Sequence, residues 1–193
     1  MESVDVHEVA ESGAHKNDPF KTRCAMLVSV LAMILAIASL GGSNAAKEAT
    51  MHNILAANDF SFFQAKNIRQ TALKLAADDL ETQLKWPNLP AELKQGMAKR
   101  LESYRSTIAR YESEPDTGEG KKELMARARA HEHERDVALA RDPWFDVAEA
   151  LLQIAIVLMS ITLITERRMF FWAASVLGLG GALCTLNGYL LLI

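Results

Sequence analysis

The segment CAMLVSVLAMILAIASLGGSNAA, residues 24–46, decides the fold, because it contains no charged side chain. A bilayer core of about 30 Å is crossed by roughly 20 apolar residues in a helix. We therefore predict a transmembrane helix over residues 23–42. The preceding residues 1–22 are too acidic and too numerous for a signal peptide, so they predict a flexible tail before an uncleaved anchor.

Two further apolar segments predict two more transmembrane helices, over residues 147–165 and 169–193, joined by a short turn at 166–168. The first of these two is shorter, so a buried or interfacial helix is its alternative. Half of the 193 residues are hydrophobic and they occur in blocks, which excludes a simple cytosolic enzyme. The net charge of −3 argues against nucleic acid as a partner.

Basic residues near the ends of the apolar segments predict the orientation in the membrane. Lys21 and Arg23 precede the first segment, and Arg167 and Arg168 lie between the second and third. Such residues favour the cytoplasmic side. We expect a cytoplasmic N-terminus, with residues 43–146 and the C-terminus outside, which in a Gram-negative cell is the periplasm.

The extramembrane region, residues 43–146, is rich in helix-forming residues. Its only strong breaks are Trp86–Pro90 and the loop at 114–120. Helices are therefore expected over residues 44–85, 91–113 and 121–141, the last either stopping at Pro143 or kinking into the next segment. The predicted fold class is an all-α integral membrane protein whose extramembrane region forms a long antiparallel, coiled-coil-like helical hairpin.

The first helix of this hairpin has a thin apolar stripe with spacings of three and four. A thin stripe buries little in one copy, so we expect the hairpin to pack against copies of itself or against a partner. A self-sufficient three-helix bundle is the alternative. The stripe consists of Met51, Leu55, Asn58, Phe62, Ala65, Arg69, Ala72 and Ala76.

Two apolar segments carry stripes of small residues, which allow close packing between membrane helices. We expect both stripes to form helix–helix seams, within or between subunits; the alternative is the usual small-residue content of membrane helices. The first stripe consists of Ala25, Ser29, Ala32, Ala36 and Ser39, and the second of Ala174, Gly178, Gly181, Thr185 and Gly188.

A few polar residues fall within the apolar segments. Glu149, Gln153 and Ser160 share one helix face, and Asn187 is isolated in the last segment. Intramembrane polar groups usually face protein or water. We expect contacts in the bundle interior, with an ion or proton path as the alternative.

No pattern in the sequence predicts catalysis, a metal or a cofactor. His131 and His133 are two residues apart, about 200° around a helix, so they diverge rather than form a zinc-binding pair. The cysteines, Cys24 and Cys184, both lie in apolar segments and form no Cys-x-x-Cys pair.

Three features together resemble a known family. They are the small-residue end of the first segment (LAIASLGGSN), the block FSFFQAKNIRQ at residues 60–70, and the junction WFDVAEALLQIAIVL at residues 144–158. The chain resembles the bacterial membrane proteins catalogued as domain of unknown function 4337. This resemblance implies the three-span layout and a bacterial source, and it implies no activity. Within the block, Phe62, Phe63, Gln64 and Lys66 are read as a packing centre of the hairpin or as a docking patch.

We therefore expect a non-catalytic structural or accessory membrane protein, assembled by helix packing as a homo-oligomer or as a subunit of a larger membrane complex. The lipid bilayer and another membrane protein, or a second copy, are its expected partners; no small-molecule substrate is identified. A channel or transport component, with the face of Glu149, Gln153 and Ser160 lining a polar path, is the alternative. A membrane-bound enzyme ranks third.

Overall fold

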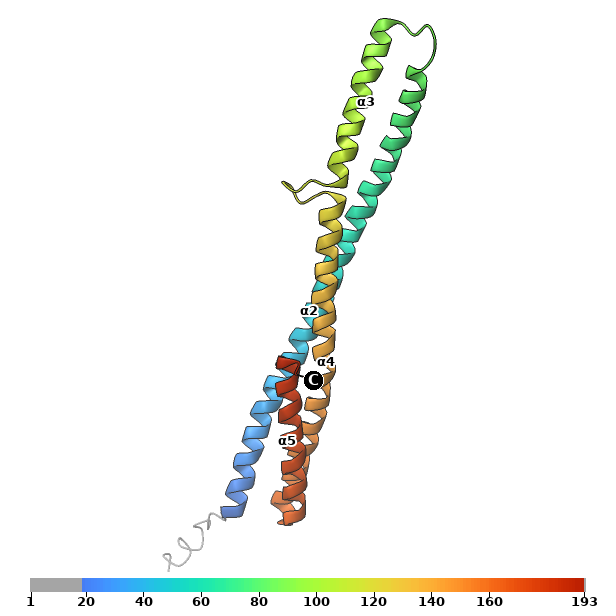
Figure 1. The fold of residues 1–193 in the computed structure, drawn as a ribbon. Coiled ribbons are helices and arrows are strands. Elements are labelled where there is room, and N and C mark those ends of the chain that lie inside the picture. The colour runs from blue at the N-terminus through green and yellow to red at the C-terminus, as the bar shows by residue number, and fades with distance from the viewer. Residues whose placement is uncertain (1–18, 193) are drawn as a thin grey trace, which may run out of the picture. The chain divides into compact units, whose positions relative to one another are not determined.

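The computed structural model describes residues 19–192, and this part of the chain is all-α, as predicted. It contains four helices, shown in Figure 1: α2 (Pro19–Leu84), α3 (Ala91–Glu112), α4 (Lys121–Thr165) and α5 (Arg168–Leu190). The chain divides into two compact units. Unit 1 comprises Met1–Ala45 and Ala140–Ile193, and unit 2 comprises Ala46–Leu139. Residues 1–18 of the predicted tail, and residue 193, lie outside the described residues.

The first helix is longer than the sequence indicated. It begins at Pro19, inside the stretch assigned to the tail, and it continues past residue 44, where a second helix was expected to start. Proline suits the first turn of a helix because its missing N–H has no partner there in any case. The small residues at 41–44 include no proline, so every backbone donor needed to continue the helix is present.

The later boundaries follow the breaks in the sequence closely. The turn at residues 85–90 contains Asn88 with a left-handed φ of 68°, and the loop after α3 contains Gly118 with the same φ. Glycine adopts this conformation without steric cost. Pro143 lies inside α4 without ending the helix, which settles the alternative that the sequence left open. The turn before α5 is shorter than predicted, because α5 already includes Arg168.

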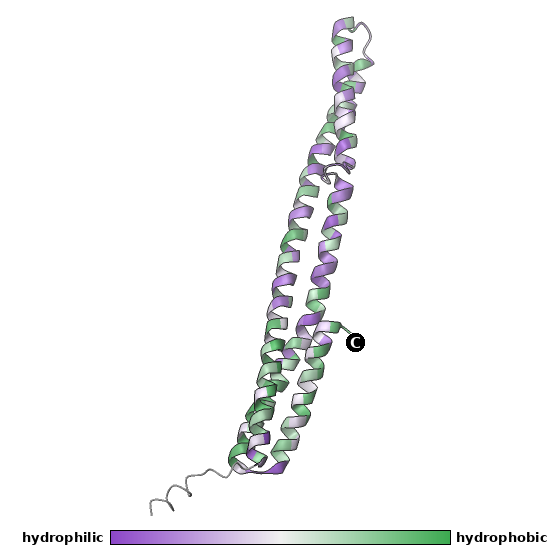
Figure 2. Ribbon diagram, turned by 90° about the vertical axis from the view of Figure 1, so that its left-hand side faces the viewer, coloured by the Kyte–Doolittle hydropathy of each residue, from purple (hydrophilic) through white to green (hydrophobic). Residues whose placement is uncertain are grey.

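Three of the helices, α2, α4 and α5, are long and apolar enough to cross a membrane. Figure 2 shows hydrophobic residues concentrated in α5 and in the parts of α2 and α4 that belong to unit 1. Lengths and composition therefore agree with an association with the membrane.

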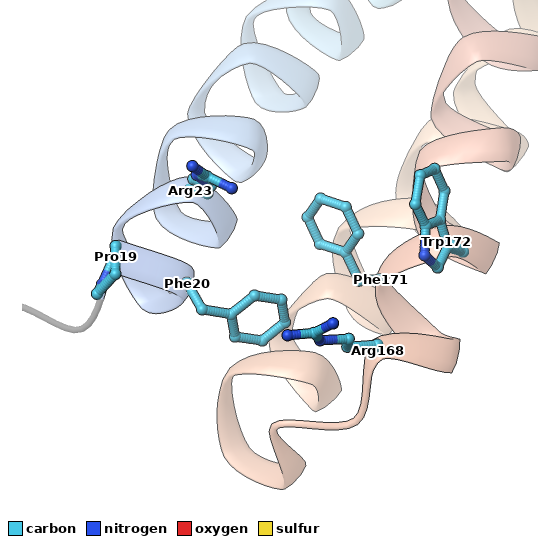
Figure 3. Close-up of a pocket in the computed structure, with 6 residues that line it drawn as sticks. All are labelled: Pro19, Phe20, Arg23, Arg168, Phe171 and Trp172. Carbon is cyan, nitrogen blue, oxygen red and sulfur yellow. The ribbon is translucent and has the colours of Figure 1, made fainter.

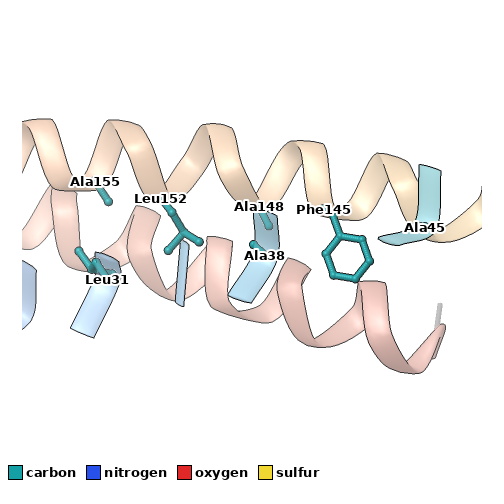
Figure 4. Packing of buried hydrophobic residues seen from close by; sticks show 7 residues of the cluster. All are labelled: Leu31, Ala38, Ala45, Phe145, Ala148, Leu152 and Ala155. Atoms are coloured by element: carbon teal, nitrogen blue, oxygen red, sulfur yellow. The ribbon is translucent and has the colours of Figure 1, made fainter. Parts of the chain in front are cut away.

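The core of unit 1 is built where α2, α4 and α5 meet. Phe145 and Leu152 of α4 are 2% and 0% exposed, and Leu31 of α2 is 3% exposed. Small residues surround these larger side chains, which lets the helix backbones approach closely. The cluster drawn in Figure 4 consists of Leu31, Ala38, Ala45, Phe145, Ala148, Leu152 and Ala155.

The core of unit 2 is thin and partly polar. Its buried apolar residues are mostly alanines of α2 and α4, with Leu101 of α3 and Leu124 of α4 as the larger members. Three polar side chains of α2 are also buried there: Asp59, Lys66 and Gln70. Burying polar groups costs free energy unless each finds a partner, so their contacts decide how this unit is held together.

Except for Gly41, which is buried beside Phe145, the buried positions of α2 follow one heptad register in both units. Spacings of seven, divided into four and three, match the seam of packed helices. The stripe expected from Met51 and Phe62 is displaced by one residue, because the true register includes polar residues that a search for apolar side chains passes over. The buried members are Cys24, Leu31, Ala38, Gly42, Ala45, Ala49, Ala56, Asp59, Lys66, Gln70 and Ala77.

Candidate functional site

The small-residue stripe of α5 forms a seam inside unit 1. All five of its predicted residues are buried: Ala174, Gly178, Gly181, Thr185 and Gly188. A Cβ atom at Gly181 would lie 2.6 Å from Cγ of Leu152 and 3.2 Å from the carbonyl oxygen of Ala148. Glycine is therefore needed where α5 crosses α4, and this seam belongs to the packing of one copy of the chain.

The small-residue stripe of α2 does not meet that seam. Each of its residues, Ala25, Ser29, Ala32, Ala36 and Ser39, is exposed. The contacts of α2 within unit 1 come instead from the neighbouring register of Cys24, Leu31 and Ala38. The seam that packs within one copy therefore lies one residue away from the predicted stripe. Contact between the exposed stripe and another chain stays a prediction.

The polar residues of the apolar segments are also separated. Glu149 is partly buried, but Gln153 and Ser160 are exposed on α4, and the Ser160 hydroxyl donates to the Ile156 carbonyl one turn earlier at 3.0 Å. Asn187 is buried and caps α5: its Oδ1 accepts the N–H of Leu192 at 2.9 Å. Asn187 is thus in the interior and Glu149 is partly so, whereas Gln153 and Ser160 lie on the surface of the described bundle.

The aromatic block on α2 faces in two directions. Phe62 is 62% exposed and Gln64 is exposed, whereas Phe63 is partly buried and Lys66 is buried. The Lys66 ammonium lies 3.4 Å from Oε2 of Glu119 and 5.6 Å from the centroid of the Tyr111 ring. Phe63 and Lys66 therefore belong to the internal packing of unit 2, and Phe62 and Gln64 to its surface.

One polar layer of unit 2 centres on Asp59. Arg127 donates to both carboxylate oxygens, from Nε at 2.9 Å and from Nη2 at 2.6 Å. This paired hydrogen bond lowers the pKa of Asp59 and outweighs the opposing effect of its burial. His131 Nε2 lies 3.9 Å from the same carboxylate, and His131 Nδ1 lies 3.1 Å from Nδ1 of His52. The layer thus joins α2 to α4 through charge and hydrogen bonds.

A second polar layer centres on Gln70, which is 1% exposed. Its Nε2 donates to the Ile108 carbonyl at 2.9 Å and to Oε2 of Glu112 at 3.0 Å, and its Oε1 accepts from Lys121 at 2.8 Å. The hydrogen bonds from Gln70 and Lys121 lower the pKa of Glu112. One side chain of α2 is therefore bonded to the end of α3 and to the start of α4.

A third carboxylate closes the loop between α3 and α4. Glu123 accepts the Ser113 hydroxyl at 2.6 Å and the Glu114 N–H at 3.2 Å. The bond from Ser113 is the main reason that the pKa of Glu123 is lowered. The loop is thereby fixed to the first turn of α4, where a carboxylate is favoured by the helix dipole.

The two polar layers can orient the helices. Within each layer the carboxylate is paired with a basic side chain, Asp59 with Arg127 and Glu112 with Lys121. Among residues 19–192, no group of three or more His, Cys, Asp or Glu side chains is placed to hold a metal ion. Sequence reasoning missed Asp59 and Gln70 as parts of the core, and Arg127 as the partner of Asp59. The available signal was the seven-residue spacing from Asp59 to Lys66, in register with Cys24, Leu31 and Ala38.

Comparisons with known proteins identify the family of the chain. A family model described as "Domain of unknown function (DUF4337)" matches residues 20–191. No curated protein matches, and no solved structure matches. The match includes the four helices except Pro19, and with them the small-residue seam of α5 and the polar layers of unit 2. The chain therefore belongs to the DUF4337 family.

Proposed function

We propose that this protein is a non-catalytic structural or accessory protein of the bacterial inner membrane, which assembles through its helix surfaces. It acts either as a homo-oligomer or as a subunit of a larger membrane complex. The observation that carries this proposal is a set of large apolar side chains exposed on α2 in unit 2, a segment that the sequence places outside the membrane.

These side chains lie outside the register that packs internally. Phe62 is 62% exposed, Ile68 70% and Leu75 67%, with Met51 and Ile54 at 61% and 55%. Single exposed apolar residues are normal on proteins, but several large ones on one helix of the same unit support an interaction surface. The alanine-rich core of unit 2 supports the same reading, because it buries little apolar area within one copy.

The exposed small residues of α2 in unit 1 provide a second surface for assembly. Ala25, Ala32 and Ala36 lie on a helix that is apolar enough to cross a membrane, and no part of residues 19–192 covers them. Small residues let a neighbouring helix approach closely in lipid. This surface would continue the assembly inside the bilayer.

The proposed orientation places the N-terminus in the cytoplasm and both residues 43–146 and the C-terminus in the periplasm. It is supported by the positions of Lys21, Arg23, Arg167 and Arg168, which all lie at one end of the apolar helices of unit 1. Basic residues favour the cytoplasmic end.

The alternative is a channel or transport component, and the exposure of Gln153 and Ser160 on α4 favours it. Several copies could bring these residues around a polar path with Glu149. If this path exists, the wild-type protein reconstituted in liposomes conducts ions, and the Glu149→Ala variant loses this ion flux. Flux that is absent in the wild-type protein, or unchanged in the variant, contradicts this alternative.

The mass of the full chain in mild detergent tests the proposal. We expect a species at a whole-number multiple of 21.3 kDa, or a defined complex with another membrane protein. The Phe62→Ser/Ile68→Ser double variant is expected to shift the mass toward the protomer. Leu93→Ser is the control. Leu93 is exposed as well, at 54%, but it lies on α3 and not on the proposed surface of α2.

Two results would contradict the proposal. One is a wild-type protein that has only the protomer mass in several mild detergents. The other is an equal loss of assembly in the double variant and in Leu93→Ser, which would indicate a general effect of added polarity. Retained helicity by circular dichroism shows that each variant is folded.

A further inference from the structure

A pocket opens in unit 1 between the first turns of α2 and α5. Its volume is about 470 Å³, and Figure 3 shows its lining residues. Both helices are apolar enough to cross a membrane and both begin here, so the pocket lies at the end of two candidate spans. The lining consists of Pro19, Phe20, Arg23, Arg168, Phe171 and Trp172.

The pocket carries two positive charges without acidic partners among residues 19–192. Glu166, the acidic residue of the neighbouring turn, pairs with Lys21 at 2.8 Å. Neither Arg23 nor Arg168 has an ion pair in the described part of the chain. No carboxylate of residues 19–192 occupies their guanidinium groups, and guanidinium matches phosphate oxygens in geometry as well as in charge.

Aromatic rings form the apolar wall of the same pocket. The ring centroids of Phe20 and Phe171 are 5.8 Å apart, and those of Phe171 and Trp172 are 5.9 Å apart in an edge-to-face arrangement. Trp172 is 67% exposed. Aromatic rings of this kind are favoured at the boundary between lipid headgroups and acyl chains. The pocket thus combines a cationic end with an apolar wall.

We propose that this pocket binds the headgroup of an anionic phospholipid, with Arg23 and Arg168 donating hydrogen bonds to the phosphate oxygens. The rings of Phe20, Phe171 and Trp172 would contact the glycerol and the first carbons of the acyl chains. Basic pockets between membrane helices recognise anionic lipids in this way. The proposal requires that α2 and α5 are inserted in a membrane, and it does not require the assembly proposed above.

Native mass spectrometry of the full-length protein in mild detergent tests the site. Phosphatidylglycerol is titrated against phosphatidylcholine with the same acyl chains, and bound lipid is counted by mass. We expect the wild-type protein to prefer phosphatidylglycerol. The Arg23→Gln/Arg168→Gln variant is expected to lose on the order of tenfold in affinity for phosphatidylglycerol, with little change for phosphatidylcholine.

Arg167→Gln/Lys122→Gln is the matched control, because it removes the same charge and neither residue lines the pocket. It is expected to bind phosphatidylglycerol as the wild type does. An equal loss in both double variants would overturn the proposal, since net charge would then explain the binding. A wild-type protein without a preference for phosphatidylglycerol would overturn it as well.

Inorganic phosphate distinguishes a lipid from a soluble anion. Displacement of phosphatidylglycerol by millimolar inorganic phosphate would overturn the assignment to lipid, whereas binding that survives this competition supports it. The same spectra report the number of protein copies. A loss of lipid binding at unchanged stoichiometry is therefore distinguishable from a failure of assembly.

Discussion

At the scale of single residues, Asp59 shows why a charged side chain can occupy a core position of α2. Its side chain is 11% exposed, and Arg127 binds both of its oxygens. An unpaired carboxylate there would be costly, but a paired one is tolerated and constrains which residues of α2 and α4 face each other. The pair therefore contributes mainly to the register between these helices.

Replacing Asp59 by Asn tests this role. The variant keeps the side-chain size but leaves Arg127 without its ion partner. We expect unit 2 to lose about 1–2 kcal/mol of stability, near the low end for charged hydrogen bonds because Arg127 is half exposed. Thermal unfolding followed by circular dichroism at pH 7 measures the loss. Asp78→Asn is the control, since Asp78 is exposed on the same helix.

The stability from Asp59 should also depend on pH in a defined direction. The pKa of this carboxyl in the folded protein lies below its ordinary value of 3.8. Its contribution is therefore complete above that value and is lost as the pH falls through the lower, folded-state pKa. In the acid range, the stability difference between wild type and Asp59→Asn is expected to shrink. A difference that grows below pH 4 would contradict this account.

At the scale of elements, α5 is held by glycines where it crosses α4. The backbone of Gly181 approaches Leu152 and Ala148 too closely for a side chain, whereas its neighbour Gly180 has room for a methyl group. A Cβ atom at Gly180 would meet Cδ1 of Leu151 at an ordinary contact distance of 3.6 Å. Two adjacent glycines in one helix thus have different roles.

This difference predicts opposite effects of two alanine substitutions. Gly181→Ala should destabilise unit 1 by about 1–3 kcal/mol, because the added methyl group forces Leu152 or the helix backbone to move. Gly180→Ala should be neutral or slightly stabilising, because alanine favours the helix more than glycine does. Thermal midpoints in a mild detergent compare the two. Equal losses would show that α5 does not pack on α4 through Gly181.

The elements also show how far the sequence could predict the structure. Prolines, glycines and polar clusters marked the turn after α2 and the loop after α3 to within a residue or two. The side of α2 that packs against the other helices was not predictable in this way. Polar residues, His52, Asp59 and Lys66, occupy inward positions there. A search for apolar residues selected Met51 and Phe62 instead, which are exposed.

At the scale of the whole molecule, the predicted orientation can be tested by cysteine labelling. The native Cys24 and Cys184 are replaced by alanine, and single cysteines are introduced at Gly96 or Arg167. Gly96 has open space around its Cβ position, and Arg167 is exposed in the turn before α5. In intact cells an impermeant maleimide is expected to label Gly96→Cys and not Arg167→Cys.

The control for this experiment is labelling after the membrane has been permeabilised, when both cysteines should react. Labelling of Arg167→Cys but not Gly96→Cys in intact cells would show the reverse orientation. Labelling of both in intact cells would show that the two sites share the outer side. The labelling pattern therefore tests the orientation that the basic-residue rule predicts.

The sequence by itself determined the helical class, the apolar helices and the main breaks, because these depend on local composition and on backbone chemistry at proline and glycine. It also carried the residues by which the family is identified. Only the tertiary structure decided which face of α2 turns inward and which polar residues pair there. That choice depends on partners far away in the chain, such as Arg127 for Asp59 and Lys121 for Gln70. In a sequence, a buried polar residue cannot be distinguished from an exposed one, because its hydrogen-bond partner becomes its neighbour only in the folded chain.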